Sequence, residues 1–255
     1  MKNPLVIANW KMKLAPSEAL ALAKKVAKAS AKFKGADVVL CPSFTELAAV
    51  SDIVRESGIQ MGAQNCFWEE QGAFTGEVSP KQLASYGVTT VIVGHSERRA
   101  HLFESGEMIH KKIRMLLSLG LRPVLCVGEQ FDDRAEGQKE AVLLRQLHDA
   151  LNGLWLTQAC ELIVAYEPVW VIGSGQDIDP NEIEHTHQVI EQSLYDLFSH
   201  QAVDEHVKII YGGSVDPENV GRYTAQPTVD GVLVGTASLD ATQFSAIIAG
   251  ALKAH

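Results

Sequence analysis

The sequence predicts a single (β/α)8 barrel over residues 1–255. Eight short apolar runs recur along the chain, on average about 32 residues apart, and segments with helical periodicity separate them. A length of 255 residues suits such a barrel as one domain, and no linker divides the chain. A doubly wound open sheet is the alternative. That fold favours a glycine-rich turn after the first strand, where this chain has Asn9-Trp10-Lys11-Met12.

The expected strands are runs rich in β-branched residues. Most are almost continuously apolar, which is typical of parallel strands that are buried on both faces. They are Leu5–Trp10, Asp37–Cys41, Ile59–Gln64, Thr90–Gly94, Arg122–Val127, Leu162–Tyr166, Val207–Tyr211 and Gly231–Gly235.

Helical spacing of apolar residues marks the segments between the strands. The clearest are Glu18–Ala31, Met108–Leu119, Glu140–Leu151, Asn181–Phe198 and Phe244–Leu252. Several helix starts are also marked, because a capping side chain precedes a first-turn proline or a Gln or Glu at the third helical position. These starts lie at Ser79-Pro80, Asp179-Pro180, Asp216-Pro217 and Asp240.

Composition narrows the class of protein. The net charge of −9 argues against nucleic acid as a partner, because phosphate backbones favour Lys and Arg. It also requires a local positive group wherever an anionic substrate binds. The four cysteines form no C-x-x-C pair, and no apolar stretch is long enough to cross a membrane or to act as a signal peptide. We expect a soluble cytoplasmic protein with reduced thiols.

Polar residues gather where the strands end. In a (β/α)8 barrel the active site lies at the carboxyl ends of the strands. Here those ends read Asn9-Trp10-Lys11, Gly94-His95-Ser96-Glu97-Arg98, Tyr166-Glu167-Pro168, Tyr211-Gly212-Gly213-Ser214 and Gly235-Thr236. A lysine, a histidine and a glutamate therefore converge on one rim, beside two glycine-containing turns.

Each of the three charged or titratable residues also has an ordinary interpretation. Lys11 alone resembles a solvated surface lysine, and His95 alone a hydrogen-bonded histidine at the rim. Glu167 is different, because it follows an apolar strand directly and has Trp170 nearby. A partly desolvated carboxylate is a better proton acceptor. Together the three residues favour catalysis.

The glycine turns after the last two strands predict a phosphate site. Gly212-Gly213-Ser214 and Gly235-Thr236 can direct backbone N–H groups into a concavity, at the place where barrels of this kind bind phosphate. Either turn alone can instead be no more than a tight turn.

Other motifs fail. The stretch beginning at Gly94 lacks the closing glycine of a nucleophile elbow, and Gly173-Ser174-Gly175 does not complete a dinucleotide fingerprint. His185 and His187 point about 200° apart on a helix, so they do not share a metal ion. The sequence predicts neither a cofactor nor a metal.

The stretches that carry these residues resemble the triosephosphate isomerase family. The matching motifs span nearly the whole chain in the order of the family. They are Asn9-Trp10-Lys11-Met12, Gly62-Ala63-Gln64-Asn65, Gly72-Ala73-Phe74-Thr75-Gly76-Glu77, Gly94-His95-Ser96-Glu97-Arg98-Arg99, Ala165-Tyr166-Glu167-Pro168-Val169-Trp170, Ile172-Gly173, Tyr211-Gly212-Gly213-Ser214-Val215 and Asp230-Gly231.

The resemblance implies the activity and the role of each residue. A member of this family, an aldose–ketose isomerase on a TIM barrel, interconverts glyceraldehyde 3-phosphate and dihydroxyacetone phosphate through an enediolate, without cofactor or metal. Glu167 would be the base and His95 the electrophile. Asn9 and Lys11 would hold substrate and developing charge, with Glu97 supporting Lys11. Pro168–Ser174 resembles the lid, and the phosphate would be held by the backbones of Gly173, Ser214, Gly235 and Thr236.

The chain departs from the family at Lys13, Val171, Ser174 and Thr236. Of these four residues, only Thr236 is at a position expected to contact the ligand. A β-branched residue there is unstrained only if its φ is negative, which fits a short helical start at Thr236-Ala237-Ser238-Leu239.

Two alternative functions remain. The chain could be another phosphosugar isomerase or epimerase on the same barrel, or a catalytically silent homologue that binds phosphometabolites.

The connection Asn65–Ser79 is long for a strand-to-helix loop and carries Phe67, Trp68 and Phe74. Exposed aromatic residues in such a loop predict an interface, and a loop folded on itself is the alternative. The resemblance implies that the loop tip near Thr75 enters a neighbouring subunit close to that subunit's Lys11 and His95. We therefore expect a homodimer through residues 65–79.

Overall fold

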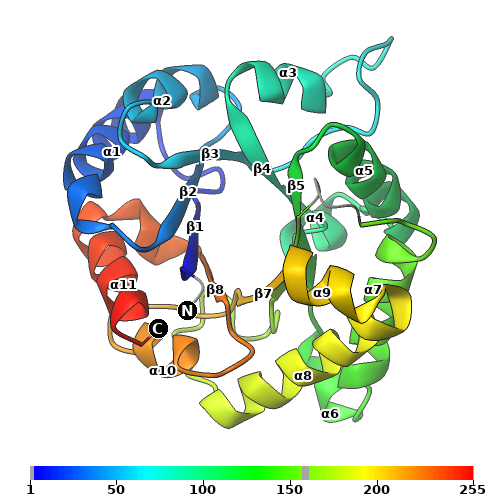
Figure 1. Cartoon of the computed structure of the whole chain (residues 1–255). Helices are drawn as coiled ribbons and strands as arrows, with labels where there is room; N and C mark the ends of the chain where they lie inside the picture. Colours follow the sequence, from blue (N-terminus) through cyan, green and yellow to red (C-terminus); the bar gives the residue numbers. More distant parts are fainter. Residues whose placement is uncertain (1–2, 157–160, 255) are drawn as a thin grey trace.

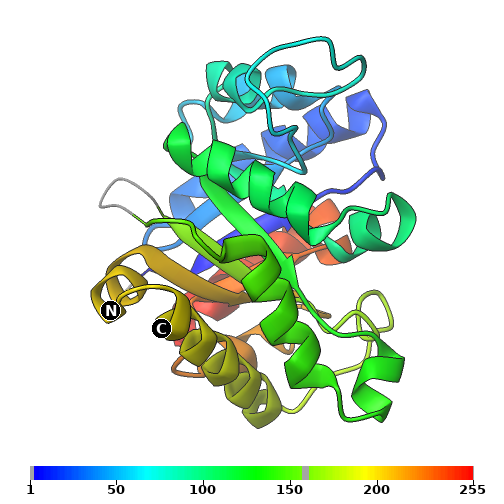
Figure 2. The same cartoon turned by 90° about the vertical axis from the view of Figure 1, so that its right-hand side faces the viewer.

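A closed barrel of eight parallel strands forms the centre of the molecule, and helices surround it (Figures 1 and 2). The computed structural model describes residues 3–156 and 161–254. The strands pair in sequence order, and β1 closes the barrel by pairing with β8. The strands are β1 Leu5–Asn9, β2 Asp37–Cys41, β3 Gln60–Ala63, β4 Val88–Val93, β5 Arg122–Val127, β6 Leu162–Tyr166, β7 Val207–Tyr211 and β8 Gly231–Val234. The predicted barrel is confirmed.

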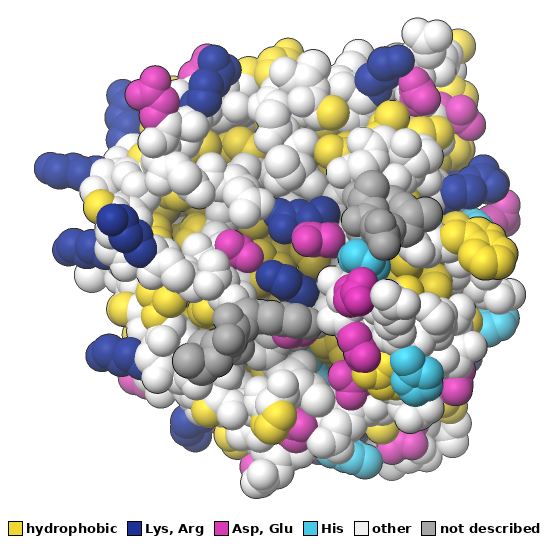
Figure 3. All heavy atoms as spheres, in the orientation of Figure 1, with side chains coloured by type: hydrophobic (Ala, Val, Ile, Leu, Met, Phe, Trp, Pro, Cys, Tyr) yellow, Lys and Arg dark blue, Asp and Glu magenta, His cyan; other side chains and the backbone are white. Residues whose placement is uncertain are grey.

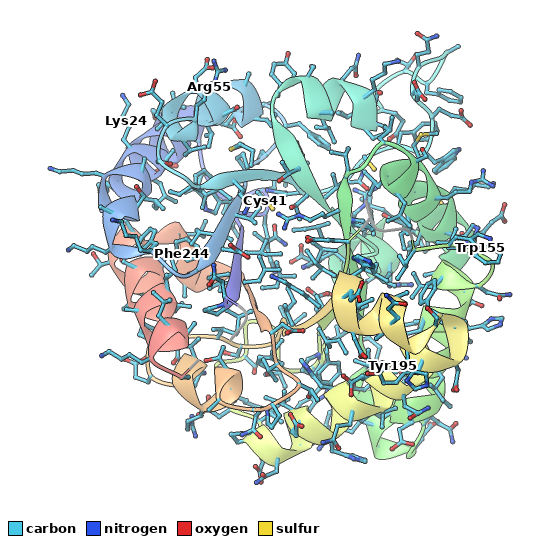
Figure 4. All side chains as sticks on the ribbon, viewed as in Figure 1. Lys24, Cys41, Arg55, Trp155, Tyr195 and Phe244 are labelled. Atoms are coloured by element: carbon cyan, nitrogen blue, oxygen red, sulfur yellow. The ribbon has the colours of Figure 1, made fainter. Side chains whose placement is uncertain are left out.

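Both faces of each strand are buried, which explains the continuous apolar runs. Leu5 and Ile7 of β1 belong to a core inside the barrel, whereas Val6 and Ala8 belong to the larger core between strands and helices. This alternation follows from the two-residue period of a strand. Cys41 of β2 also lies in the inner core, while Lys24 and Arg55 point outward from the helical layer (Figure 4).

The five helices expected from periodicity are present with shifted ends, and shorter helices occur between them. The α-helices are α1 Pro16–Ala29, α2 Leu47–Val54, α3 Pro80–Ser85, α4 Ser96–His101, α5 Gly106–Ser118, α6 Phe131–Ala135, α7 Lys139–Leu151, α8 Pro180–Leu197, α9 His200–His206, α10 Val220–Thr224 and α11 Ala241–Ala254. The 3-10 helices η1 Ser30–Lys32 and η2 Thr236–Leu239 complete the set for the described residues. The expected first helix therefore ends as a 3-10 turn.

Three of the four expected helix starts, at Ser79, Asp179 and Asp240, are built as capping interactions. The fourth prediction is wrong, because Asp216 accepts hydrogen bonds from the Glu218 and Asn219 N–H groups in a turn, and α10 begins only at Val220. The Ser79 hydroxyl accepts hydrogen bonds from the Lys81 and Gln82 N–H groups at the start of α3. The Asp240 carboxylate accepts from the N–H groups of Thr242 and Gln243 at the start of α11. These side chains satisfy N–H groups that have no partner within the helix.

The loop between β3 and α3 projects from the barrel at the upper right of Figure 1. Its aromatic residues differ from the expectation, because only Phe74 is exposed, at 43%, whereas Phe67 is buried. The Phe67 ring stacks on Trp68 at a centroid distance of 4.0 Å and contacts Phe74 at 4.6 Å. The base of the loop is thus folded on itself, and its exposed part lies toward the tip.

The surface and the thiols add two observations. Lysine and arginine side chains gather over α1, at the left of the face in Figure 3. Cys41, Cys66 and Cys126 are free and buried, and burial raises the pKa of Cys66 to about 12; Cys160 lies outside the described residues. Among the described residues, no helix is long and apolar enough to cross a membrane.

Candidate active site

Eight residues singled out in the sequence line one cavity of about 90 Å³ at the carboxyl ends of the strands. The strand-end turns bring them together from β1, β4, β6, β7 and β8, which are far apart in the chain. The eight residues are Asn9, Lys11, His95, Glu167, Gly173, Ser214, Gly235 and Thr236.

The backbone of Lys11 is held in an unusual conformation. Its φ is +53°, in the left-handed region that non-glycine residues rarely adopt. The Lys11 N–H donates to the Asn9 side-chain oxygen at 3.1 Å, and the Lys11 carbonyl accepts from Ser43 Oγ and from Gln64 Nε2. These contacts compensate a conformation that costs about 1–3 kcal/mol, and they fix the direction of the side chain.

The Lys11 ammonium group forms an ion pair with Glu97, with Nζ to Oε1 at 2.7 Å. Burial opposes ionisation of the Glu97 carboxyl, but the hydrogen bond from Lys11 and nearby positive charges hold its pKa below the usual range. A Cβ atom on Gly235 would lie 3.6 Å from Lys11 Cε, so the lysine stem passes beside this glycine. Glu97 itself does not line the cavity, and it acts on the cavity through Lys11.

His95 is oriented by the helix that follows it. It is the N-cap residue of α4, and its Nδ1 accepts a hydrogen bond from the Glu97 N–H at 3.2 Å. An acceptor role for Nδ1 leaves the proton of a neutral ring on Nε2. Nε2 lies 3.2 Å from Glu167 Oε1, so the ring presents an N–H donor to the cavity.

Glu167 is almost completely buried, with 2% of its surface exposed. Its second carboxylate oxygen, Oε2, accepts from the Ser96 N–H at 3.3 Å. Two glycines make room for it: a Cβ atom on Gly128 would lie 1.7 Å from the Glu167 carbonyl oxygen, and one on Gly212 would lie 2.9 Å from Glu167 Cγ. Glu167 is thus tightly packed, through its backbone against the end of β5 and through its side chain against the ends of β4 and β7.

The turns after β7 and β8 also line the cavity. Gly235 directly precedes the 3-10 helix η2, which begins at Thr236. Among the described residues, only Lys11 and Phe103 have a positive φ without being glycine, so the expected negative φ of Thr236 is confirmed. Ser214 and Gly173 lie at the same cavity. Such an arrangement of turns and a helical start is suited to an anion.

Glu129 is a buried residue that was not among the site residues predicted from the sequence. It is fully buried next to the segment Pro168–Ser174, and its Oε1 accepts from Trp170 Nε1 at 2.9 Å and from the Tyr166 hydroxyl at 3.2 Å. Its carbonyl accepts from the Val169 N–H. Glu129 follows β5 after Gly128. Its position just after a strand is the same signal that identified Lys11, His95 and Glu167.

Thr75 lies outside the cavity of its own chain. It is exposed on the loop between β3 and α3, as a contact to a second chain would require.

In residues 3–156 and 161–254, no group of three or more His, Cys, Asp or Glu residues is arranged to hold a metal ion.

The cavity combines a carboxylate, an imidazole N–H, an ammonium group and backbone turns suited to an anion. A carboxylate and an N–H donor that face the same space can remove a proton from carbon while the donor stabilises the developing oxyanion. This chemistry fits proton transfer next to the carbonyl of a small phosphorylated substrate.

Comparisons with known proteins agree with this geometry. The model of the family "Triosephosphate isomerase" matches residues 4–251. The triosephosphate isomerase of Solibacter usitatus is 43% identical over 248 residues, covering 97% of this chain and 99% of that protein. The triosephosphate isomerase of Carboxydothermus hydrogenoformans is 42% identical over 252 residues, covering 99% of this chain and 100% of that protein.

A solved structure agrees as well. The crystal structure of triosephosphate isomerase from Bartonella henselae superposes with a TM-score of 0.85 at 31% identity, covering 96% of this chain and 97% of that one. The family model, over residues 4–251, covers the barrel and every strand end that contributes to the cavity. The chain belongs to the triosephosphate isomerase family.

Proposed function

We propose that this chain interconverts glyceraldehyde 3-phosphate and dihydroxyacetone phosphate, with Glu167, His95 and Lys11 as its catalytic residues. The observation that carries the proposal is the buried Glu167 carboxylate, 3.2 Å from a histidine Nε2, in a cavity that also contains Lys11. A catalytically silent homologue has no need to bury a carboxylate beside this donor, because isolated buried charges destabilise the fold.

The reaction needs one proton carrier and one oxyanion site. Glu167 takes the proton from the carbon next to the carbonyl, and the electron pair moves to the carbonyl oxygen to form an enediolate. His95 Nε2–H and the Lys11 ammonium group stabilise the oxygen charge, while Asn9 fixes Lys11. A proton then passes from the hydroxyl oxygen of the enediolate to the former carbonyl oxygen, and Glu167 returns its own proton to the neighbouring carbon, so that the carbonyl group ends on the adjacent position. No net oxidation occurs, so the residues need no redox cofactor.

The segment Pro168–Ser174 is the proposed lid over this cavity. Its first part is anchored, because Trp170 donates to Glu129 and the Arg134 guanidinium lies 4.7 Å from the Trp170 ring centroid. Its far end, Gly173 and Ser174, is exposed. Closure over the substrate would exclude water, which protects a reactive enediolate from side reactions.

Turnover by the purified protein tests the activity. We expect glyceraldehyde 3-phosphate to be converted to dihydroxyacetone phosphate in buffer with EDTA and without any added cofactor. Binding of triose phosphate without turnover would instead favour the silent homologue. Turnover of another phosphosugar, with no conversion of triose phosphate, would favour a different isomerase or epimerase.

The substrate phosphate is expected to accept hydrogen bonds from the backbone N–H groups of Gly173, Ser214, Gly235 and Thr236. Thr236 allows a matched test, because Thr236→Val removes only the hydroxyl, whereas Thr236→Pro removes the N–H and keeps a negative φ. We expect Thr236→Val to change the Kd of glycerol phosphate less than about threefold. Thr236→Pro should raise it about tenfold or more, since a hydrogen bond to a charged group contributes about 1.5–3 kcal/mol. Equal losses in calorimetric titrations would refute the backbone contact.

We infer that two copies of the chain form a homodimer through the loop of residues 65–79. Phe74 near the loop tip is exposed, as are Met12 and Tyr86 at 94% and 49%. A groove of about 460 Å³, lined by Phe44, Leu47, Val78, Leu83 and Tyr86, offers an apolar surface beside the loop. Exposed apolar surface of this kind is covered in stable assemblies.

Light scattering at micromolar concentration measures this association. The unmodified protein should have the mass of a dimer, and Phe74→Asp should give a monomer with reduced activity, because a charge at the interface opposes burial. Trp155→Asp is the matched control: Trp155 is another exposed aromatic residue, outside the loop, and its replacement should leave the dimer intact. A fully active wild-type monomer would contradict the inference.

The proposed compartment is the cytoplasm. The free thiols of Cys41, Cys66 and Cys126 fit a reducing environment. Interconversion of triose phosphates also belongs to glycolysis and gluconeogenesis, which the family name implies.

A further inference from the structure

Arg99 joins two strand ends directly behind the proposed base. It lies on α4, and its Nε donates to the Gly94 carbonyl at 2.7 Å while its Nη2 donates to the Cys126 carbonyl at 3.0 Å. Gly94 directly follows β4 and directly precedes His95, and Cys126 lies near the end of β5. One guanidinium group therefore fixes the relative position of the two strands from which the cavity wall is built.

Glu167 lies between two cavities. The first is the substrate cavity described above, and the second, of about 220 Å³, is lined by Arg99, Arg145, Asp133 and Glu167 among other residues. Arg99 lines only the second cavity. It therefore approaches Glu167 from the side away from substrate, whereas His95 and Lys11 lie on the substrate side.

Within residues 3–156 and 161–254, Arg99 forms no close ion pair. The preceding residue, Arg98, pairs with Glu104, whereas the Arg99 side chain donates to two neutral carbonyl groups. Burial lowers the pKa of Arg99, and the negative charges of Glu104, Glu167 and Asp149 oppose that effect. An arginine stays protonated under these conditions, so a fixed positive charge stands near the carboxylate.

We propose that Arg99 is a positioning residue for the isomerase reaction: its guanidinium holds the ends of β4 and β5 in register behind Glu167, and so fixes the positions of His95 and of the base. This rests on the proposed role of Glu167 as base. The groups that face Glu167 are His95 from the end of β4, Arg99 from α4 and the Cys126 thiol from β5. Lys11 shares the substrate cavity, and Asp133 and Arg145 share the second cavity.

Substitutions at Arg99 separate its geometry from its charge. Arg99→Gln removes the charge and Arg99→Lys keeps it, while both lose the two-pronged contact with the carbonyl groups. Arg145→Gln is the matched control, because Arg145 lines the same cavity but is exposed. The measurements are kcat and KM for glyceraldehyde 3-phosphate.

We expect Arg99→Gln to lower kcat about tenfold or more and to change KM less than threefold, because Arg99 does not line the substrate cavity. Arg99→Lys should lower kcat to a similar extent, because it also loses the two-pronged contact, and Arg145→Gln should resemble the wild type in kcat and KM. If Arg99→Gln does not fold, a lowered kcat with an unchanged KM in Arg99→Lys supports the inference, and a wild-type kcat overturns it.

A wild-type kcat in folded Arg99→Gln would overturn the inference, as would an equal effect of Arg145→Gln. Either result is distinguishable from failure of the proposed function. The wild type would still convert triose phosphate and Glu167→Gln would still lose that activity, so only the role of Arg99 would be wrong.

Discussion

Replacing Glu167 by glutamine is expected to lower kcat about 10²-fold or more while the fold stays intact. The amide occupies nearly the same volume, so the close packing against Gly128 and Gly212 is kept. It has almost no basicity, so the proton on the substrate carbon has no acceptor. The Ser96 N–H can still donate to the amide oxygen in place of the carboxylate Oε2.

Three measurements complete this test. Circular dichroism should show an unchanged fold, and glycerol phosphate should bind with a Kd within a few-fold of that of the wild type. Glu107→Gln removes the same charge from the exposed surface of α5 and should leave kcat unchanged. Near-normal activity in folded Glu167→Gln would remove Glu167 from its role as base.

Replacing Lys11 by methionine is expected to weaken binding of glycerol phosphate about 10- to 100-fold, the loss expected for a hydrogen bond to a charged group. The chain carries a net charge of −9, so attraction of a phosphate dianion depends on local cations. Lys11 is the lysine in the substrate cavity, and the substitution also leaves Glu97 without its ion-pair partner. The affinity of the mutant should depend less on salt, because the lost interaction is ionic.

Lys13→Met is the matched control for this result. Lys13 is two residues away and exposed, so its replacement changes the net charge equally without touching the cavity. We expect its Kd and salt dependence to remain close to those of the wild type. If both substitutions weaken binding equally, the effect arises from overall charge, and the specific role of Lys11 is wrong.

The barrel could be predicted from the sequence because the evidence for each strand lies within one short stretch of the chain. Parallel strands buried on both faces give continuous apolar runs, and the structure places Leu5, Val6, Ile7 and Ala8 in two cores on opposite faces of β1. The short helices were harder to predict. α4 has six residues and α6 has five, too few for a periodic pattern, and tertiary contacts decide whether such segments are helical.

The residues at the strand ends were predictable for the same reason, but the contacts between them were not. Lys11 and Glu97 are 86 positions apart, and only the closed barrel makes them an ion pair. Gly128 has no side chain, so its close approach to Glu167 cannot be recognised from a sequence motif. In the loop of residues 65–79, packing of the Phe67 ring against Trp68 and Phe74 depends on the loop conformation, which explains why the exposure of these side chains was overestimated.

Transfer of the substrate proton through Glu167 is tested most directly by running the reaction in D2O. A carboxylate that carries the proton between the two carbons exchanges part of it with solvent, so the product should contain deuterium on the carbon that receives the proton. Product and recovered substrate can be analysed by NMR after many turnovers. The account predicts deuterium at that position with the wild-type protein. Complete conversion with no solvent deuterium in either compound would show that hydrogen moves directly between the carbons, which contradicts proton transfer through Glu167.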